Sequence, residues 1–368
     1  MKILYDHQMF SVQKYGGITR YFTELIKNLP SEHQFSLPII FSDNHYMSEY
    51  SKIFKNINFL PDRNFKGKPF IRKKLYFINQ IYSRYFISSN NFDLFHPTFY
   101  DNYFLKLLKK PFIITVHDLN AIKFKGAFYK SGSMVPQMES LIKNANRIIS
   151  ISENTKKDLV EIFNLNPEKI DVIYHGFNKR NNIKQCTNKI IDNFGKYILY
   201  VGHRSLYKNF NTFAEAVSKL LKREKGVKLV CVGSPFTNKE KVLLSKLKIA
   251  NRTIALSVDD ITLNYLYSNA MVFVYPSLYE GFGMPILEAF ANNCPVCLSN
   301  TSCFPEIAQN AGVFFDPYDH ESILSAIEKV IYDYDCSKEI IIAGQKRLTS
   351  FSWEKAAKET ISSYNKAI

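Results

Sequence analysis

Short apolar runs alternate with longer amphipathic stretches along almost the whole chain. Such runs are typical of buried strands, and the amphipathic stretches are typical of helices that cover a parallel sheet. After Gly16-Gly17, for example, apolar residues recur at helical spacing from Ile18 to Leu29. The pattern predicts an α/β fold. The strands expected in the first half are Lys2–Tyr5, Phe35–Phe41, Phe92–Phe95, Phe112–Val116, Arg147–Ile151 and Lys169–Ile173.

The polar stretch Asn178–Asn188 interrupts this alternation, which then restarts. We interpret it as a linker between two domains, over residues 1–178 and 189–352. A last amphipathic stretch, residues 353–368, is predicted to be a helix that packs back on the first domain. Two open parallel sheets would bind ligands in a cleft at the carboxyl ends of their strands. The elements expected in the second domain are Tyr197–Val201, Asn211–Lys225, Lys228–Val232, Met271–Tyr275 and Pro295–Leu298.

Length and composition fit this organisation. The 368 residues suffice for two domains of about 150–200 residues each. No apolar run approaches the roughly 18 residues of a membrane helix, and Met1–His7 is interpreted as a strand and not as a secretory signal. We therefore expect a cytoplasmic protein with reduced cysteines. Cys294 and Cys297 have C-x-x-C spacing, but no second ligand pair accompanies them, so they are interpreted as structural.

The net charge of +15 indicates either attraction to anionic partners or a basic solvated surface. No recognised nucleic-acid-binding motif or concentrated basic stripe is present, so nucleic acid is not an expected partner. Residues 64–85 mix aromatic and basic side chains. This stretch suits peripheral association with an anionic membrane, and the alternative is a buried helix with a solvated basic face.

The segment Glu280–Glu288 carries the most specific chemistry. It follows the expected strand Met271–Tyr275 and contains Gly281 and Gly283, which let the backbone approach a ligand closely. Pro285 suits the first position of a helix, and the N–H groups from Phe282 to Leu287 would form an anion site at the helix N-terminus. A carboxylate accepts two hydroxyl hydrogen bonds, so Glu288 is predicted to bind a ribose and Glu280 to lie nearer the reacting sugar.

Three further positions follow predicted strands. Arg204 and Lys208 come after Tyr197–Val201 and would suit a diphosphate, since arginine offers a fork and lysine a mobile charge. His117 ends the strand Phe112–Val116, and Asp118 is expected to cap or orient its loop. Gly16 and Gly17 either bring backbone N–H groups to a ligand or form a turn that starts a helix.

Together these segments resemble the motifs of retaining glycosyltransferases of the glycosyltransferase family 4 type. Glu280–Glu288 resembles the Glu-x7-Glu signature of that family, and the resemblance extends over nearly the whole chain. It implies the GT-B fold, with two Rossmann-like domains that bind the acceptor and the nucleotide sugar respectively. The other segments that carry it are Tyr15-Gly16-Gly17-Ile18, Val116-His117-Asp118-Leu119, Ser150–Thr155, Gly202-His203-Arg204 and Lys208-Asn209.

The resemblance also implies roles for these residues. Catalytic roles fall to Glu280, His117, Arg204 and Lys208, with no covalent nucleophile. Metal-dependent glycosyltransferases usually carry an Asp-x-Asp after a strand, but Asp333-Tyr334-Asp335 lies in a helical region and is interpreted as structural. We expect no metal and no cofactor besides the donor substrate. The residues implied to bind that donor are Gly16, Gly17, Arg204, Lys208, Phe282, Gly283, Met284, Pro285 and Glu288.

The predicted function is transfer of a hexose, with retention, to a glycan or lipid-linked glycan in bacterial surface polysaccharide synthesis, as for an O-antigen or a capsule. The His-Asp-Leu form of the motif at His117 favours a GDP-mannose or GDP-deoxyhexose donor, with a UDP-hexose as the alternative. Three different classes of protein also fit parts of the pattern: a GT-B-fold sugar-nucleotide epimerase, a non-catalytic nucleotide-sugar-binding protein and a basic nucleic-acid-binding protein. The expected site of action is the cytoplasm, including the inner face of the cell membrane.

Overall fold

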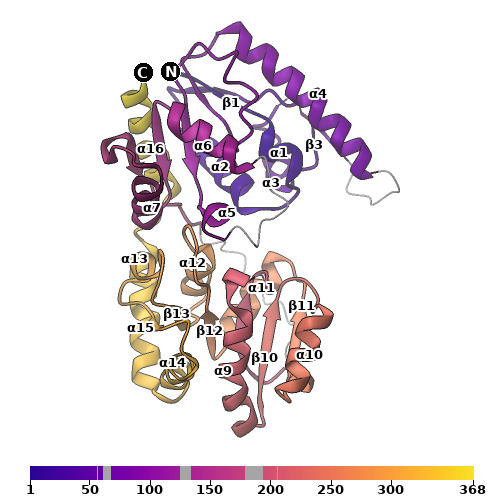
Figure 1. Ribbon diagram of the computed structural model, residues 1–368, viewed down its shortest axis with the longest axis vertical. Coiled ribbons are helices and arrows are strands. Elements are labelled where there is room, and N and C mark those ends of the chain that lie inside the picture. The colour runs from indigo at the N-terminus through magenta and orange to yellow at the C-terminus, as the bar shows by residue number, and fades with distance from the viewer. Residues whose placement is uncertain (56, 61–67, 125–133, 179–193, 205) are drawn as a thin grey trace. The chain divides into compact units, whose positions relative to one another are not determined.

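A computed structural model describes residues 1–55, 57–60, 68–124, 134–178, 194–204 and 206–368. Contacts divide the chain into two units (Figure 1). Unit 1 comprises Met1–Lys123, Phe128–Gly176 and Ser352–Ile368, and unit 2 comprises Phe124–Ala127 and Phe177–Phe351. Both units are built of parallel strands and helices, which confirms the predicted α/β class. Of the predicted linker, all but Asn178 lies outside the described residues.

Unit 1 contains two three-stranded parallel sheets, in the orders β2-β1-β5 and β6-β7-β8. A parallel bridge between Phe95 and Phe112 connects β5 to β6, so the two sheets continue into one another. The carboxyl ends of β1, β5 and β6 therefore lie along one edge. The strands are β1 (Lys2–Tyr5), β2 (Gln34–Ser36), β5 (Leu94–His96), β6 (Ile113–Val116), β7 (Arg147–Ser150) and β8 (Ile170–Val172).

The single strand predicted over Phe35–Phe41 is wrong. The chain leaves the main sheet after Ser36, and β3 (Phe41–Ser42) pairs instead with β4 (Asn58–Phe59) in a separate two-stranded ladder. Pro38 lies between the two short strands. Because proline has no N–H to donate to a ladder, it interrupts a strand even within an apolar run.

Helices cover the unit 1 sheet from both sides (Figure 1). Tyr21, Phe22 and Leu25 of α2 pack in the same apolar cluster as Trp353 and Tyr364 of α16, so the C-terminal helix is part of the unit 1 core. The helices are α1 (Gln8–Val12), α2 (Gly17–Lys27), α3 (His45–Glu49), α4 (Lys68–Ser89), α5 (Asn120–Lys123), α6 (Met134–Asn144), α7 (Glu153–Phe163), the 3-10 turn Pro167–Lys169 and α16 (Trp353–Ala367).

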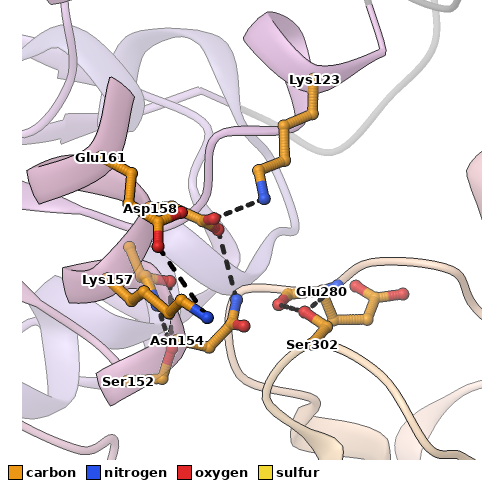
Figure 2. Close-up of polar contacts among 9 residues, drawn as sticks. Lys123, Ser152, Asn154, Lys157, Asp158, Glu161, Glu280 and Ser302 are labelled. Atoms are coloured by element: carbon orange, nitrogen blue, oxygen red, sulfur yellow. Dashed lines mark hydrogen bonds and ion pairs between the residues drawn. The ribbon is translucent and has the colours of Figure 1, made fainter. Parts of the chain in front are cut away.

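Helix α7 begins immediately after β7, and its N-terminus is capped by a side chain. The Ser152 hydroxyl accepts a hydrogen bond from the N–H of Thr155 at 3.1 Å, as expected at an N-cap. Asp158, one turn later, forms an ion pair with Lys123 of α5 and accepts a hydrogen bond from Asn154 at 3.3 Å (Figure 2). These contacts connect α5, which follows the His117 loop, to α7.

A buried chain of hydroxyl and imidazole groups connects α16 to the sheet. The Tyr364 hydroxyl lies 3.0 Å from the Tyr5 hydroxyl and 2.6 Å from His96 Nδ1. His96 Nε2 lies 3.0 Å from Thr115 Oγ1, which is 3.2 Å from the Tyr21 hydroxyl of α2. Because buried polar groups need partners, these hydrogen bonds determine how α2 and α16 pack on the sheet.

Unit 2 is a six-stranded parallel sheet in the order β11-β10-β9-β12-β13-β14. Its strands are β9 (Lys196–Val201), β10 (Val227–Val232), β11 (Thr253–Leu256), β12 (Val272–Tyr275), β13 (Val296–Ser299) and β14 (Val313–Phe315). The chain runs outward from β9 to β11 and then returns to the other side of β9 with β12. The order therefore reverses between β9 and β12, the place where open α/β sheets bind ligands.

The helices of unit 2 bury an extensive apolar core against this sheet. Cys231 and Cys297 lie in that core, and burial raises the pKa of both thiols. Asp333 caps α15, accepting a hydrogen bond from the Cys336 N–H at 2.9 Å, so this residue of the Asp-x-Asp triplet has a structural role. The helices are α9 (Phe210–Arg223), α10 (Asn238–Lys246), α11 (Asp260–Asn269), α12 (Met284–Ala291), α13 (Phe304–Ala308), α14 (His320–Tyr332) and α15 (Tyr334–Leu348), with 3-10 turns at Leu206–Lys208 and Ala250–Arg252.

Across the part of the chain that the structure describes, no helix combines the length and apolar character needed to span a bilayer.

Unit 1 should lose stability in mild acid because it buries four histidines. Burial lowers the pKa of His7, His96 and His117 to about 3 and lowers that of His175 well below its usual value. The unfolded chain takes up protons near pH 6.5 and the native unit does not, so stability is lost as the pH falls from about 6.5 toward 3. Burial raises the pKa of Asp6. The native unit can therefore bind at most one extra proton there, which partly offsets the loss of stability in acid.

Fluorescence of Trp353, the single tryptophan of the chain, reports unit 1 unfolding because this side chain lies in the unit 1 core. We expect the free energy of urea unfolding to fall by more than about 2 kcal/mol between pH 7.5 and pH 5. His7→Gln should reduce the proton uptake on unfolding by about one, because burial lowers the pKa of this imidazole to about 3. A pH-independent unfolding free energy over this range would contradict the assignment.

Candidate functional site

The candidate site of unit 2 is assembled from the loops that follow β9 and β12. These strands are hydrogen-bonded neighbours, so their loops emerge side by side at the point where the strand order reverses. Lys208 ends the 3-10 turn after β9, and Glu280 lies in the loop after β12. Lys208 Nζ is 2.5 Å from Glu280 Oε1, and both side chains are largely buried. The structure thus brings together two residues predicted to be catalytic.

The backbone of Glu280 is held by a serine from the loop after β13. The Glu280 N–H donates to Ser302 Oγ at 3.1 Å, and the Ser302 hydroxyl donates to the Glu280 carbonyl at 2.7 Å (Figure 2). Burial and the nearby Glu280 carboxylate raise the pKa of Tyr275, so its hydroxyl stays protonated. Glu280 is therefore positioned by its backbone, while its carboxylate interacts with Lys208.

Arg204 lies in a different ion pair. Its Nε donates to Glu240 Oε1 at 2.8 Å, and Nη2 donates to the carbonyls of Ser234 and Pro235 at 2.5 and 3.0 Å. The guanidinium also lies over the Phe236 ring, 4.7 Å from its centroid. Nη1 is the one nitrogen of this buried guanidinium that has no partner among the described residues. Arg204 and Lys208 are thus each paired with a different carboxylate, and their predicted contact with a diphosphate stays a prediction.

The start of α12 differs in detail from the prediction. Gly283 is the N-cap with φ +90°, Met284 is the first helical residue, and Pro285 is the second and not the first. The Ile286 N–H donates to the Gly283 carbonyl at 2.9 Å, and proline has no N–H. Within the described chain, the Gly283 and Met284 amides have no protein acceptor. Pro285 and Ile286 therefore offer no free amide to the anion site that was expected from Phe282 to Leu287.

Two side chains flank this helix start. Phe282 is buried and packs edge-on against Phe351, with ring centroids 5.7 Å apart, so only its backbone is a candidate for ligand binding. Glu288 lies one turn into α12 and accepts a hydrogen bond from the Tyr267 hydroxyl of α11 at 3.3 Å. Burial and this carboxylate raise the pKa of Tyr267, which keeps the donor proton in place.

In unit 1, His117 follows β6 and its ring is buried among aromatic side chains. The ring lies edge-on to Tyr21 at 5.1 Å and 6.0 Å from His175 between ring centroids. The backbone N–H of His117 donates to the Tyr100 hydroxyl at 3.2 Å. Because burial lowers the pKa of His117 to about 3, the imidazole is neutral at physiological pH. Its Nε2 has no partner among the described residues and remains available for a neutral hydrogen bond.

The glycine loop and Asp118 complete the predicted positions of unit 1. Gly16 is the N-cap of α2, where a Cβ would come within 2.2 Å of Gln13 Oε1, whereas Gly17 has open space around its Cα. A Cβ at Gly16 would displace only the flexible end of the Gln13 side chain, and Gly17 leaves room for a ligand. The Asp118 carboxylate accepts a hydrogen bond from the Asn120 N–H at 2.9 Å, so it orients its loop as expected.

Sequence reasoning missed Glu240, Ser302 and Tyr267, which hold Arg204, Glu280 and Glu288. One signal was readable: Thr237 and Glu240 have the spacing of a capping box, and both of its hydrogen bonds are present. Ser302 and Tyr267 act across 22 and 21 residues of sequence. No local pattern connects residues at such separations.

The arrangement suits a polyhydroxylated anion. The helix N-terminus and Lys208 favour negative charge, and Glu288 and Glu280 are acceptors for hydroxyl groups. Within the described ranges, no group of three or more His, Cys, Asp or Glu side chains is placed to hold a metal ion. Fold and site thus define an α/β protein whose candidate ligand site lies at a strand-order reversal.

Family comparison makes this assignment specific. Residues 15–180 match Glycosyltransferase Family 4, and residues 169–347 match Glycosyl transferases group 1. The chain belongs to the GT-B glycosyltransferases, as the motifs predicted.

Similar proteins include the O-antigen chain mannosyltransferase RfbU of Salmonella typhimurium, 28% identical over 59% of this chain and 60% of that protein. The O-antigen chain mannosyltransferase B of Escherichia coli is 29% identical over 72% of each chain. Among solved structures, a glycosyltransferase from Rickettsia africae has a TM-score of 0.70 at 21% identity, covering 100% of this chain and 98% of that one. Anabaena HepE in complex with UDP and glucose has a TM-score of 0.73 at 14% identity, covering 99% of both. These structures confirm two Rossmann-like domains.

Removing the partner of Arg204 should destabilise unit 2. Glu240→Gln leaves a buried guanidinium without its carboxylate, which costs about 3 kcal/mol of unfolding free energy. Calorimetric unfolding measures the change. Glu215→Gln is the matched control, since it breaks the exposed Glu215–His320 pair and should change stability by less than about 0.5 kcal/mol. Equal effects of the two substitutions would show that the Arg204 pair is not a buried structural contact.

Proposed function

We propose that this glycosyltransferase transfers a hexose from a nucleotide diphosphate donor to a glycan of a bacterial surface polysaccharide, with retention of configuration and without a metal. The observation that carries the proposal is the Lys208–Glu280 pair at the strand-order reversal of unit 2, where the Glu280 loop leads to the N-terminus of α12. The acceptor is a free or lipid-linked glycan, and the protein acts in the cytoplasm.

GDP-mannose, or a related GDP-deoxyhexose, is the first choice of donor. Two similar proteins are named O-antigen chain mannosyltransferases, and the chain carries the His117-Asp118-Leu119 form of the histidine motif. A UDP-hexose is the alternative, because Anabaena HepE, of similar fold, was crystallised with UDP-glucose.

The donor would be bound in unit 2 by groups that the structure positions separately. The Gly283 and Met284 amides and Lys208 would bind the diphosphate, and Arg204 would contribute Nη1. Glu288 would accept hydrogen bonds from the ribose, and Glu280 would position the sugar. Each charge-assisted contact is worth about 1.5–3 kcal/mol. A diphosphate would compete with Glu280 for Lys208, so donor binding would also release the Glu280 carboxylate toward the sugar.

The proposed reaction is a front-face displacement. The bond between the anomeric carbon and the phosphate oxygen breaks, a bond to the acceptor oxygen forms on the same face, and the departing phosphate takes the acceptor proton. Lys208 stabilises the charge that grows on the diphosphate, and Glu280 stabilises the oxocarbenium-like carbon without bonding to it. In unit 1, neutral His117 would donate or accept a hydrogen bond through Nε2, and Gly16 and Gly17 would offer backbone contacts.

A thermal-shift screen tests the donor class. UDP, GDP, ADP and TDP, with and without their sugars, are each added in the presence and absence of EDTA. We expect one nucleotide diphosphate to raise the melting temperature equally in both, because its charge is bound by amides and Lys208. A shift that requires metal, or the absence of any shift, would contradict the proposal. Product analysis separates transfer from epimerisation, since an epimerase converts the donor without an acceptor.

Single substitutions test the residue roles. Glu288→Ala should weaken donor binding by about tenfold to a hundredfold, since it removes hydrogen bonds to a charged acceptor. Calorimetric titration measures the affinity, and Glu328→Ala on the outer part of α14 is a control that should bind normally.

Lys208→Ala should lower kcat, and Arg204→Ala with Lys208→Ala should abolish turnover. Wild-type rates in the double variant would refute the diphosphate assignment.

A further inference from the structure

Helix α4 (Lys68–Ser89) is attached to unit 1 along one side. Asn79 Oδ1 accepts hydrogen bonds from the N–H groups of Ile40 and Phe41 at 3.0 and 3.2 Å. The Ser83 hydroxyl donates to the Pro38 carbonyl at 3.1 Å, and the Tyr76 hydroxyl donates to Asp101 at 3.1 Å. These bonds from consecutive turns fix the rotation of the helix about its axis, so the side that faces outward is determined.

The outward side is apolar. Phe70, Phe77 and Tyr85 are 63%, 60% and 70% exposed, although aromatic side chains of this size are normally covered. At 3.6 residues per turn the exposed residues occupy roughly 160° of the helix circumference, opposite Asn79 and Ser83. We call this set the α4 outer face, and its apolar members are Phe70, Ile71, Phe77, Ile78, Ile81 and Tyr85. Figure 1 shows α4 as a long helix at the margin of unit 1.

Basic residues lie within the same face. Lys73, Lys74 and Arg84 are exposed, and Lys74 Nζ lies 4.6 Å from the centroid of the Phe70 ring. The sequence from residue 68 to residue 89 contains no Asp or Glu, so no carboxylate of the helix itself compensates these cations. Arg72 differs from them because it turns inward to an ion pair with Asp43.

Because the α4 outer face is both apolar and cationic, only some kinds of partner suit it. A second copy of this chain would bring the same cations face to face, which is unfavourable. An anionic bilayer suits both the apolar and the basic side chains. The apolar side chains enter the region between headgroups and acyl chains, and Lys and Arg remain among the lipid phosphates. Phe, Tyr, Lys and Arg are also the residues that suit this interface.

We propose that the α4 outer face binds the surface of an anionic lipid bilayer and holds unit 1 there as a peripheral protein. The surface lies on a helix that carries none of the predicted donor or catalytic residues. Membrane binding is therefore independent of the proposed reaction and is measured without donor or acceptor. Residues 64–67 of the basic aromatic stretch lie outside the described residues, and the α4 outer face is defined by side chains from Phe70 onward.

Flotation with lipid vesicles tests the proposal. The full chain should float with vesicles of phosphatidylcholine mixed with phosphatidylglycerol at low salt, float less at high salt, and stay behind with phosphatidylcholine alone. Phe77→Ser with Ile81→Ser should weaken binding at least about tenfold by removing buried apolar area. Lys73→Glu with Lys74→Glu should weaken it by a similar factor, and this loss should shrink as salt is raised.

Helix α15 provides matched controls, because it also has exposed apolar and basic side chains. Tyr334→Ser with Ile342→Ser and Lys338→Glu with Lys346→Glu make the same chemical changes there and should bind vesicles as the wild type does. Trp353 fluorescence of the α4 variants shows that unit 1 is folded, because this side chain lies in the unit 1 core.

Three results would overturn the proposal. The first is a wild-type chain that does not float with anionic vesicles at low salt. The second is binding that the α4 substitutions leave unchanged, which would assign it to another surface. The third is self-association in sedimentation velocity that Phe77→Ser with Ile81→Ser abolishes while vesicle binding persists, which would make α4 an interface between copies of the chain.

Discussion

Parallel strands bring all of their following loops to one edge of a sheet, and unit 2 depends on this constraint. Because the strand order reverses between β9 and β12, the loops carrying Lys208 and Glu280 emerge beside each other although 72 residues separate them in sequence. Ser302, from the loop after β13, then holds the Glu280 backbone. The candidate site is thus a consequence of strand order, and Lys208, Glu280 and Ser302 follow three different strands.

Charge is compensated within this site although the protein as a whole is strongly basic. Lys208 is paired with Glu280 and Arg204 with Glu240, so neither cation is an uncompensated attractor of anions. Such pairs hold long side chains in place before a ligand arrives, and the proposed diphosphate would exchange with one carboxylate. This arrangement favours an anion that also offers hydroxyl groups to the displaced carboxylate, and a sugar nucleotide has both. The exposed cations Lys73, Lys74 and Arg84 of α4 differ, because no acidic residue occurs in that helix.

Unit 1 relies on neutral hydrogen bonds. His96 connects Tyr364 to Thr115, and Thr115 lies beside the Tyr21 hydroxyl. The Tyr21 ring in turn packs against His117. Burial keeps these imidazoles uncharged, so the same network that attaches α16 to the sheet also determines where the His117 ring lies. A neutral imidazole provides a directed hydrogen bond but no charge. The candidate residues of unit 1 thus offer neutral hydrogen bonds, whereas those of unit 2 offer charged groups.

Local sequence patterns were enough to predict the α/β class, most strands and the motifs, because apolar periodicity, glycine and proline act within a few residues. They identified Glu280–Glu288 as a loop leading into a helix, but they began that helix at Pro285 and not at Met284. They also predicted one strand where the structure has β2 and β3 on either side of Pro38. The folded chain was needed to show that Arg204 binds Glu240, that Tyr267 holds Glu288 and which side of α4 faces outward. The physical reason is that these outcomes depend on contacts between segments far apart in sequence, and strand order sets those contacts.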